Sequence, residues 1–249
     1  MAFLVLIALG LPIGVLIGLI GIGGVLLTPA LVHIFGRDIH TAVSLSLASF
    51  VLAGIVAAAR TRGGAGRLQT NDWIFLAAIV PGALAGTLSA PWIPAGPLSL
   101  IVSACVAFAG VSSLRKPAGG DGAAFNGGLL GGLGVVTGFL SAVSGSGGPL
   151  IGLPLLLWNG MEVRRALLLA QVAQLPVAGT ATLVNGYSGA VDFVTAGILG
   201  IAIVVGMLVG FAVSRRIETA LLRTSVAWSL VIVGLALCVA DLWRIVHGA

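Results

Sequence analysis

Long apolar stretches separated by short polar gaps occupy most of the chain. A helix that crosses a bilayer needs about 20 consecutive, mostly apolar residues. Stretches that approach or exceed this length cover residues 3–35, 41–59, 73–93, 97–114, 126–160, 164–184, 192–213 and 222–246. The pattern predicts an all-α polytopic membrane protein.

The stretches 3–35 and 126–160 are too long for single helices, and glycines interrupt both of them. The first contains GIGG at residues 21–24 and the second contains GSGG at residues 145–148. An apolar run and a proline follow each motif. We therefore expect each stretch to form a helical hairpin that turns at its glycines.

The two glycine motifs belong to a longer internal repeat. Shifting the chain by 124 residues places GIGG on GSGG and matches roughly ten of about thirty positions. The matching residues are Gly14, Leu16, Gly21, Gly23, Gly24, Leu26, Leu31, Gly36, Ala42 and Leu45. Further on, Asp72 falls near Asp192 and Gly86 near Gly206. We expect an N-terminal repeat at 1–115, a polar, glycine-rich linker at 116–125 and a C-terminal repeat at 126–249.

The basic residues predict how the two halves are oriented, because Lys and Arg in short loops favour the cytoplasm. Basic residues mark the loops 60–67, 115–116, 164–165 and 215–223 as cytoplasmic, whereas 91–97 and 186–191 carry none. The linker is then cytoplasmic, and equivalent points of the two halves face opposite sides. This predicts two inverted-topology repeats, each a glycine-broken hairpin followed by three transmembrane helices.

Composition supports a lipid environment and excludes other classes of protein. Hydrophobic residues make up 59% of the chain and charged residues 8%, against roughly 45–50% and about 25% in soluble proteins. The net charge of +5 comes from bases in the gaps, so no basic face for nucleic acid is expected. Cys105 and Cys238 lie in apolar segments, where a free cysteine acts as a small hydrophobe. We expect no cofactor and no metal.

Glycine at the two breaks has a chemical consequence inside a membrane. Irregular backbone survives there only when it is buried in protein or lines a polar cavity. A helix that starts at such a break points free N–H groups and its positive dipole end at the cavity, which suits a small anion. The candidate binding residues at the breaks are Gly21, Gly23, Gly24, Gly145, Gly147 and Gly148. The alternative reading is that these glycines only allow close helix packing.

Polar side chains within the apolar stretches are further candidates for the binding site. They are Ser44 and Ser46, Ser144 and Ser146 beside the second break, and Gln171 and Gln174, which a continuous helix would place on one face. Hydrogen bonds between neighbouring helices, or to their own helix, would equally explain these residues. The carboxylates at positions 38, 72, 162, 192, 218 and 241 fall at segment ends or in loops. A carboxylate proton relay is therefore unsupported.

The two broken stretches together carry a family resemblance. GVLIGLIGIGGVLLTPALVHIFG and its echo GFLSAVSGSGGPLIGLPLLLWNG resemble the TauE/SafE family of sulfite and organosulfonate exporters. The resemblance implies a secondary transporter of small sulfur-containing or carboxylate anions, such as sulfite or sulfoacetate, working outward across the bacterial inner membrane.

The partners expected on this reading are a small anionic substrate and membrane lipid, and a homodimer stays open. A non-transporting structural subunit is the alternative function. An embedded enzyme lacks a cluster of His, Asp, Glu or Cys to work with.

Overall fold

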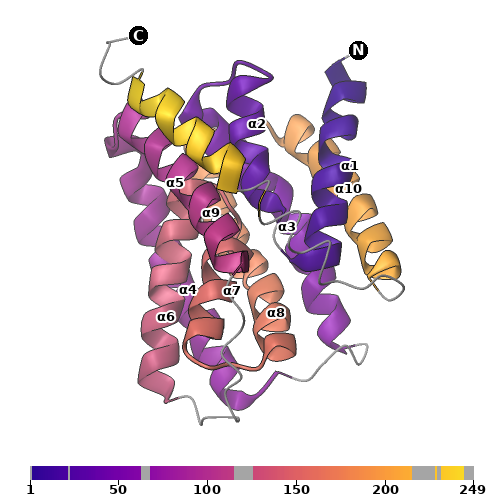
Figure 1. The fold of residues 1–249 in the computed structure, drawn as a ribbon, viewed down its shortest axis with the longest axis vertical. Coiled ribbons are helices and arrows are strands. Elements are labelled where there is room, and N and C mark those ends of the chain that lie inside the picture. Colours follow the sequence, from indigo (N-terminus) through magenta and orange to yellow (C-terminus); the bar gives the residue numbers. More distant parts are fainter. Residues whose placement is uncertain are drawn as a thin grey trace.

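The computed structural model describes residues 2–21, 23–62, 68–114, 126–214, 228 and 231–243. Within these ranges every regular element is a helix, which confirms the predicted all-α fold (Figure 1). The longer helices are α1 (Ala2–Ile20), α3 (Ile39–Arg62), α4 (Thr70–Ser89), α5 (Ala95–Leu114), α6 (Gly127–Ser144), α9 (Gln174–Tyr187), α10 (Phe193–Val213) and a last helix, Val231–Trp243. The shorter ones are η1 (Gly24–Leu26), α2 (Leu27–His33), η2 (Ala90–Trp92), α7 (Pro149–Trp158) and α8 (Val163–Val172). The predicted linker and parts of the stretch 222–246 lie outside the described residues.

Six helical segments of the described residues are long and apolar enough to cross a membrane. They are Ile39–Thr61, Thr70–Trp92, Ala95–Ser112, Gly127–Ser144, Val163–Tyr187 and Phe193–Val213. The chain is therefore a multi-pass membrane protein. The arms Gly24–His33 and Pro149–Trp158 are shorter, and at 1.5 Å per residue each rises about 15 Å, half of a 30 Å bilayer core.

Contacts between helix termini define two ends of the bundle. The upper end in Figure 1 carries the start of α3, the end of α4 and the turn from α9 to α10, whose residues line one cavity. Asp192 lies there, and its pKa is lowered chiefly by a hydrogen bond from Thr195 and, less strongly, by the charge of Arg37. At the lower end, the starts of α4 and α8 meet, and Arg60 at the end of α3 stacks on Phe211 at the end of α10.

The two glycine-broken hairpins enter the bundle from opposite ends. Helix α1 runs parallel to α10, because Gly10 lies against Ala202 while Gly18 lies against Gly210. Since α10 starts at the upper end, so does α1, and α2 returns toward that end (Figure 1). Helix α6 runs parallel to α4 from the lower end, and α7 returns there.

The α1–α10 and α4–α6 contacts repeat each other at a constant shift of 124 residues. Gly14 faces the carbonyl of Ile203, and the residues 124 positions away, Gly138 and Ile79, face each other in the same way. A second set pairs Gly206 with the carbonyl of Leu11 and Gly82 with that of Val135. Gly82 therefore corresponds to Gly206. The sequence comparison that placed Gly86 near Gly206 is wrong by about one helical turn.

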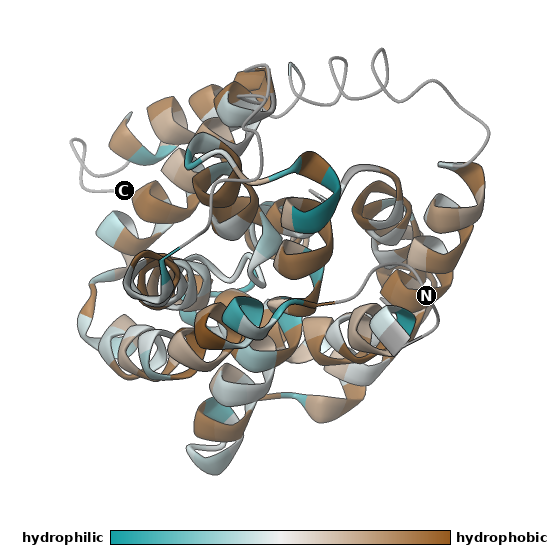
Figure 2. Cartoon of the chain, turned by 90° about the horizontal axis from the view of Figure 1, so that it is seen from below, coloured by the Kyte–Doolittle hydropathy of each residue, from teal (hydrophilic) through white to brown (hydrophobic). Residues whose placement is uncertain are grey.

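Apolar side chains cover the outside of the bundle, as a lipid-facing surface requires. Large exposed apolar residues on α4 and α10 include Val80, Leu84, Leu88, Ile201, Val205 and Leu208. Seen from below, the outer helices are mostly brown and white, and hydrophilic residues gather at helix ends and nearer the centre (Figure 2). Exposed aromatic side chains lie near both ends, among them Trp92, Tyr187 and Trp243 at the upper end and Trp73 and Trp158 at the lower. Such aromatic belts mark membrane–water interfaces.

Replacing a glycine at a helix crossing should destabilise the protein, and a glycine in open space serves as the control. Gly138→Ala puts a methyl group against the backbone of α4, and overpacking of this kind costs about 1–3 kcal/mol. Gly132 on the same helix has no atom within 4 Å of an added methyl group. Gly132→Ala should therefore be neutral or stabilising. Thermal unfolding in detergent measures both, and equal melting temperatures would contradict the packing described.

An ion pair at the lower end joins the two halves of the chain. Arg165 donates from Nε and Nη2 to Oδ1 of Asp72 over 3.1 and 2.6 Å, and Asp72 is fully buried. The second carboxylate oxygen accepts the backbone N–H of Gln69 at 2.8 Å. Asp72 lies at a helix start, as its sequence position indicates, but inside the protein.

Removing the arginine should be costly because it leaves a buried carboxylate without its counter-charge. We expect Arg165→Ala to destabilise the protein by about 3–5 kcal/mol. The adjacent Arg164 is exposed, so Arg164→Ala should change stability by about 0.5 kcal/mol or less. The same melting assay compares the two variants, and a similar small effect in both would mean that the pair contributes little.

Candidate functional site

The two glycine tips meet inside the bundle. A methyl group added at Gly24 in the first tip would lie 3.2 Å from the backbone oxygen of Ser146 in the second. The space between the tips is bounded by Gly21, Gly23, Gly24, Val25, Ser146, Pro149, Leu150 and Gln174, all of them uncharged. In this conformation it is too small to hold a water molecule. The tips thus enclose a closed, partly polar pocket.

The first glycine of each tip has the same backbone conformation. Gly21 and Gly145 have φ of 77° and 68°, and each donates its N–H back to the helix that it ends. This left-handed geometry favours glycine strongly. Beyond it the tips differ, since Gly147 has φ of 77° whereas Gly23 has φ of −141°. A methyl group on Gly23 would meet the backbone of α1 itself, at 2.7 Å from the carbonyl oxygen of Ile13.

Helices begin at both tips, η1 at Gly24 in the first and α7 after the second, and α9 adds a third start beside them. Helix α7 starts at Pro149, directly after the second tip, as predicted. The stretch 164–184 divides at Ala173, so that α9 starts at Gln174, whose backbone N lies 3.3 Å from a methyl group added at Gly148. Pro176 explains this break, because it lacks the N–H that would bond the carbonyl four residues earlier.

The two glutamines lie on either side of the break at Ala173. Gln171 lies in the last turn of α8 and Gln174 begins α9, and the backbone of Ala173 between them stays right-handed helical. Both still approach the first tip, since Gln171 Nε2 lies 3.8 Å from a methyl group added at Gly21. Gln174 is 1% exposed, and its side-chain oxygen has no hydrogen-bond partner among the described residues. A buried amide oxygen without a partner is costly.

The serine candidates divide into three roles in the structure. Ser144 donates to Ser146 at 2.9 Å within the second tip. Ser46 accepts a 3.0 Å hydrogen bond from Thr28, whose hydroxyl also lies 3.5 Å from the carbonyl oxygen of Gly145. Ser46 therefore supports the tip from α3 and does not line the pocket. Ser44 faces a separate cavity.

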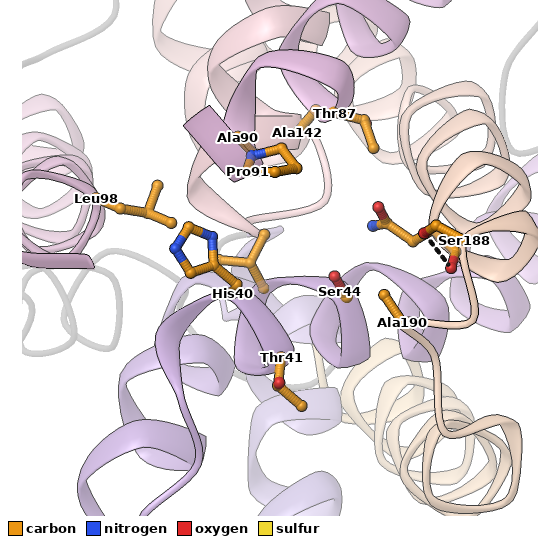
Figure 3. Close-up of a pocket in the computed structure, with 12 residues that line it drawn as sticks. His40, Thr41, Ser44, Thr87, Ala90, Pro91, Leu98, Ala142, Ser188 and Ala190 are labelled. Carbon is orange, nitrogen blue, oxygen red and sulfur yellow. Dashed lines mark hydrogen bonds between the residues drawn. The ribbon is translucent and has the colours of Figure 1, made fainter. Parts of the chain in front are cut away.

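This second cavity opens at the upper end and has a volume of about 340 Å³. Its lining residues are His40, Thr41, Val43, Ser44, Thr87, Ala90, Pro91, Leu98, Ala142, Asn185, Ser188 and Ala190. Figure 3 shows His40 and Ser44 on α3 across the cavity from Ala90 and Pro91. The backbone of Val43 in its lining lies 3.1 Å from a methyl group added at Gly145. Val43 therefore stands between this cavity and the second tip.

Two residues at the site were missed by the sequence analysis. Thr28 follows the first tip and reaches the second, and the ring of Phe50 lies against glycines of both tips. The internal repeat offers a signal for Phe50, because a shift of 124 residues places it on Gln174. Its apolar character gave no reason to examine it.

Asp241 lies near the end of the last described helix, as its sequence position indicates, but inside the protein. It belongs to the last helix, is 3% exposed, and accepts a 2.6 Å hydrogen bond from Ser103 of α5. Ser103 lies eight residues after the start of α5, about 12 Å along its axis. A buried carboxylate therefore lies near the end of this helix, bonded to α5.

Accessibility to a reagent distinguishes the open cavity from the sealed contact beneath it. In a protein whose own cysteines are replaced, Ser44→Cys should react with a membrane-impermeant thiol reagent applied from one side only. Ser46→Cys should react far more slowly, because residue 46 is fully buried against Thr28. Mass spectrometry of the labelled protein measures both. Equal labelling of the two positions would contradict the cavity floor described here.

No group of three or more His, Cys, Asp or Glu residues that could hold a metal occurs in the part of the chain that the structure describes.

Comparison with curated proteins and with solved structures gives no match. The sequence model of the family described as "Sulfite exporter TauE/SafE" matches residues 6–237 of the 249, and so includes both hairpins and the helices around them. The chain therefore belongs to the TauE/SafE family, whose members are membrane transporters that export sulfur anions.

Proposed function

We propose that this protein exports small sulfur-containing anions, with sulfite as the first substrate to test, across a bacterial inner membrane. The observation that carries the proposal is the meeting of two glycine tips in an uncharged pocket, beside the first turns of α7 and α9 and the buried side chain of Gln174. Helix starts present backbone N–H groups and positive dipole ends, which favour a small anion. A non-transporting structural subunit would have no use for such a pocket. Carboxylates such as sulfoacetate are larger candidates for the same site.

The binding roles follow from the groups that face the pocket. First-turn N–H groups of α7 and α9 offer hydrogen bonds and the positive ends of two helix dipoles. The Ser146 hydroxyl and the Gln174 amide, rotated to present its NH₂, add donors. Gln171 and Ser144 support these two residues from either side. The glycines Gly21, Gly23, Gly24, Gly145, Gly147 and Gly148 let the backbone approach the anion.

An inverted repeat accounts for the way in which the tips meet. In this proposal residues 1–115 and 126–249 are related halves joined by the segment 116–125. The helix contacts that recur at a shift of 124 residues support the relation, and so do the opposite directions of the two hairpins. Both tips come from one chain, so a single copy holds a complete site.

The proposal places the lower end in the cytoplasm. Among the described bases, Arg60, Arg62, Arg164 and Arg165 lie at that end and only Arg37 at the upper one. The cavity of about 340 Å³ then opens outward, while the Asp72–Arg165 pair holds the cytoplasmic starts of α4 and α8 together. In this conformation the protein is prepared to release an anion outside. Breaking the pair and opening the lower end would load the next one.

The membrane potential supplies enough energy for export without a proton. An anion that leaves a negative interior gains about 2.3 kcal/mol per charge for each 100 mV. The residues that bound the pocket carry no positive charge to neutralise the substrate, so the loaded carrier keeps its negative charge. Asp241 supports a competing mechanism, in which a proton bound near Ser103 accompanies the anion.

Transport by the purified protein in liposomes decides between these mechanisms. With equal pH on both sides, a potassium potential set by valinomycin should drive efflux of labelled sulfite. Gln174→Leu should reduce this flux about tenfold or more, because its buried donor is lost. Asn185→Ala, at the cavity rim, is a matched control that should keep most of the flux.

Two other results would contradict parts of this picture. Absence of sulfite flux in intact, folded protein would overturn the proposed substrate. Flux that follows only a pH gradient, and loses this dependence in Asp241→Asn, would replace the voltage-driven mechanism with proton coupling.

A further inference from the structure

The helices that carry the Asp72–Arg165 pair have counterparts at the upper end. The shift of 124 residues that relates the α4–α6 and α1–α10 contacts also relates two helix starts, since α8 begins at Val163 and α3 begins at Ile39. Helix α3 packs against α10, because a methyl group added at Gly200 would lie 3.0 Å from the carbonyl oxygen of Ser49. The pair of α3 and α10 at the upper end therefore corresponds to the pair of α8 and α4 at the lower end.

The ion pair itself is not repeated at the upper end. The residues 124 positions away from Asp72 and Arg165 are Ala196 and Thr41, and neither carries a charge. Ala196 is buried in the first turn of α10, whereas Thr41 lines the open cavity (Figure 3). The end of the bundle that has the ion pair is joined by it, and the end that lacks the ion pair is open.

We infer that the Asp72–Arg165 pair sets the resting conformation of the carrier, holding the lower end closed and so keeping the upper cavity open. The inference rests on the proposed function, in which the two ends open alternately. An interaction biases a conformational equilibrium only when it differs between the two states. The ion pair meets this condition, because it forms when the lower end is closed and the equivalent positions at the upper end offer no attraction in its place.

The surroundings of Asp72 make separation of the pair costly. The carboxylate is fully buried and accepts hydrogen bonds at both oxygens, from Arg165 at one and from the backbone N–H of Gln69 at the other. Removing the counter-charge from a buried carboxylate is strongly unfavourable. The Arg165 side chain is 20% exposed, so the pair lies at the edge of the lower end, where water enters when the end opens. Each transport cycle therefore breaks and re-forms the pair.

A double variant makes the two ends equivalent. Asp72→Ala with Arg165→Thr gives the lower end the residues that stand at the corresponding positions of the upper end, and removes both charges together, so that no lone buried charge remains. The readout is the labelling rate of Ser44→Cys in the open cavity by a thiol reagent. It is measured in detergent without substrate, in a protein whose own cysteines are replaced. The double variant should lower this rate about fivefold or more, because the upper end is closed more of the time.

Two single variants are matched controls. Arg165→Lys keeps the positive charge beside Asp72 and should keep most of the labelling rate. Arg164→His makes the corresponding exchange at the adjacent, exposed position, since residue 40 of the upper end is a histidine, and leaves the pair intact. It should label at the wild-type rate. Ser46→Cys reports on unfolding and should stay slow in the double variant, because residue 46 is buried against Thr28.

The labelling outcomes are separable from those of the transport assay. An unchanged Ser44→Cys rate in the double variant would overturn the inference and leave the transport proposal standing. Faster labelling at both positions 44 and 46 would mean that the pair only stabilises the fold, and would overturn the inference as well. If the double variant shifts the labelling as expected but the wild type moves no sulfite, the proposed substrate fails while the conformational bias stands.

Discussion

The need to satisfy backbone hydrogen bonds at membrane depth controls this structure. Two helical arms stop about halfway through the bundle, and their ends leave N–H groups that lipid cannot solvate. The chain meets this requirement by bringing the two tips together and covering them with α3, α8 and α9. The carbonyl oxygen of Gly145 lies 3.5 Å from the hydroxyl of Thr28, and the turn at each tip closes back onto its own helix. Of the buried side-chain atoms that lack a partner among the described residues, Oε1 of Gln174 lies at the pocket between the tips.

Close helix packing makes this arrangement possible. Glycines on α1 and α6 let their backbones approach α10 and α4 so closely that a methyl group would collide with a carbonyl oxygen. Such contacts replace the hydrophobic driving force that is absent between helices in lipid. They hold α1 against α10 and α6 against α4, and this packing keeps the two hairpin tips in contact. The buried pair of Asp72 and Arg165 adds a directional contact between the halves at the lower end.

The site departs from the regularity of the repeat, and that departure gives it its chemistry. A shift of 124 residues relates Phe50 to Gln174, so the equivalent positions carry a phenyl ring in one half and an amide in the other. Helix α3, which carries Phe50, is continuous. The helix that carries Gln174 is divided into α8 and α9 by the break that Pro176 causes. Gln174 therefore lines the pocket, whereas Phe50 packs against glycines of both tips beside it.

The sequence alone determined the helical class, the glycine breaks, the charge pattern of the loops and the family. These properties depend on local composition and spacing, which the chain carries directly. Tertiary structure decided the rest. Pro176 marks in the sequence where the helix through Gln171 and Gln174 is interrupted, but only packing brings both side chains to the first tip. Phe50 looked like ordinary core, and Asp241 like a residue at a segment end, because only packing shows which neighbours a buried side chain has. Ser44 lines the open cavity, whereas Ser46, two residues later, is buried against Thr28. This difference likewise depends on which neighbouring helices cover each face of α3.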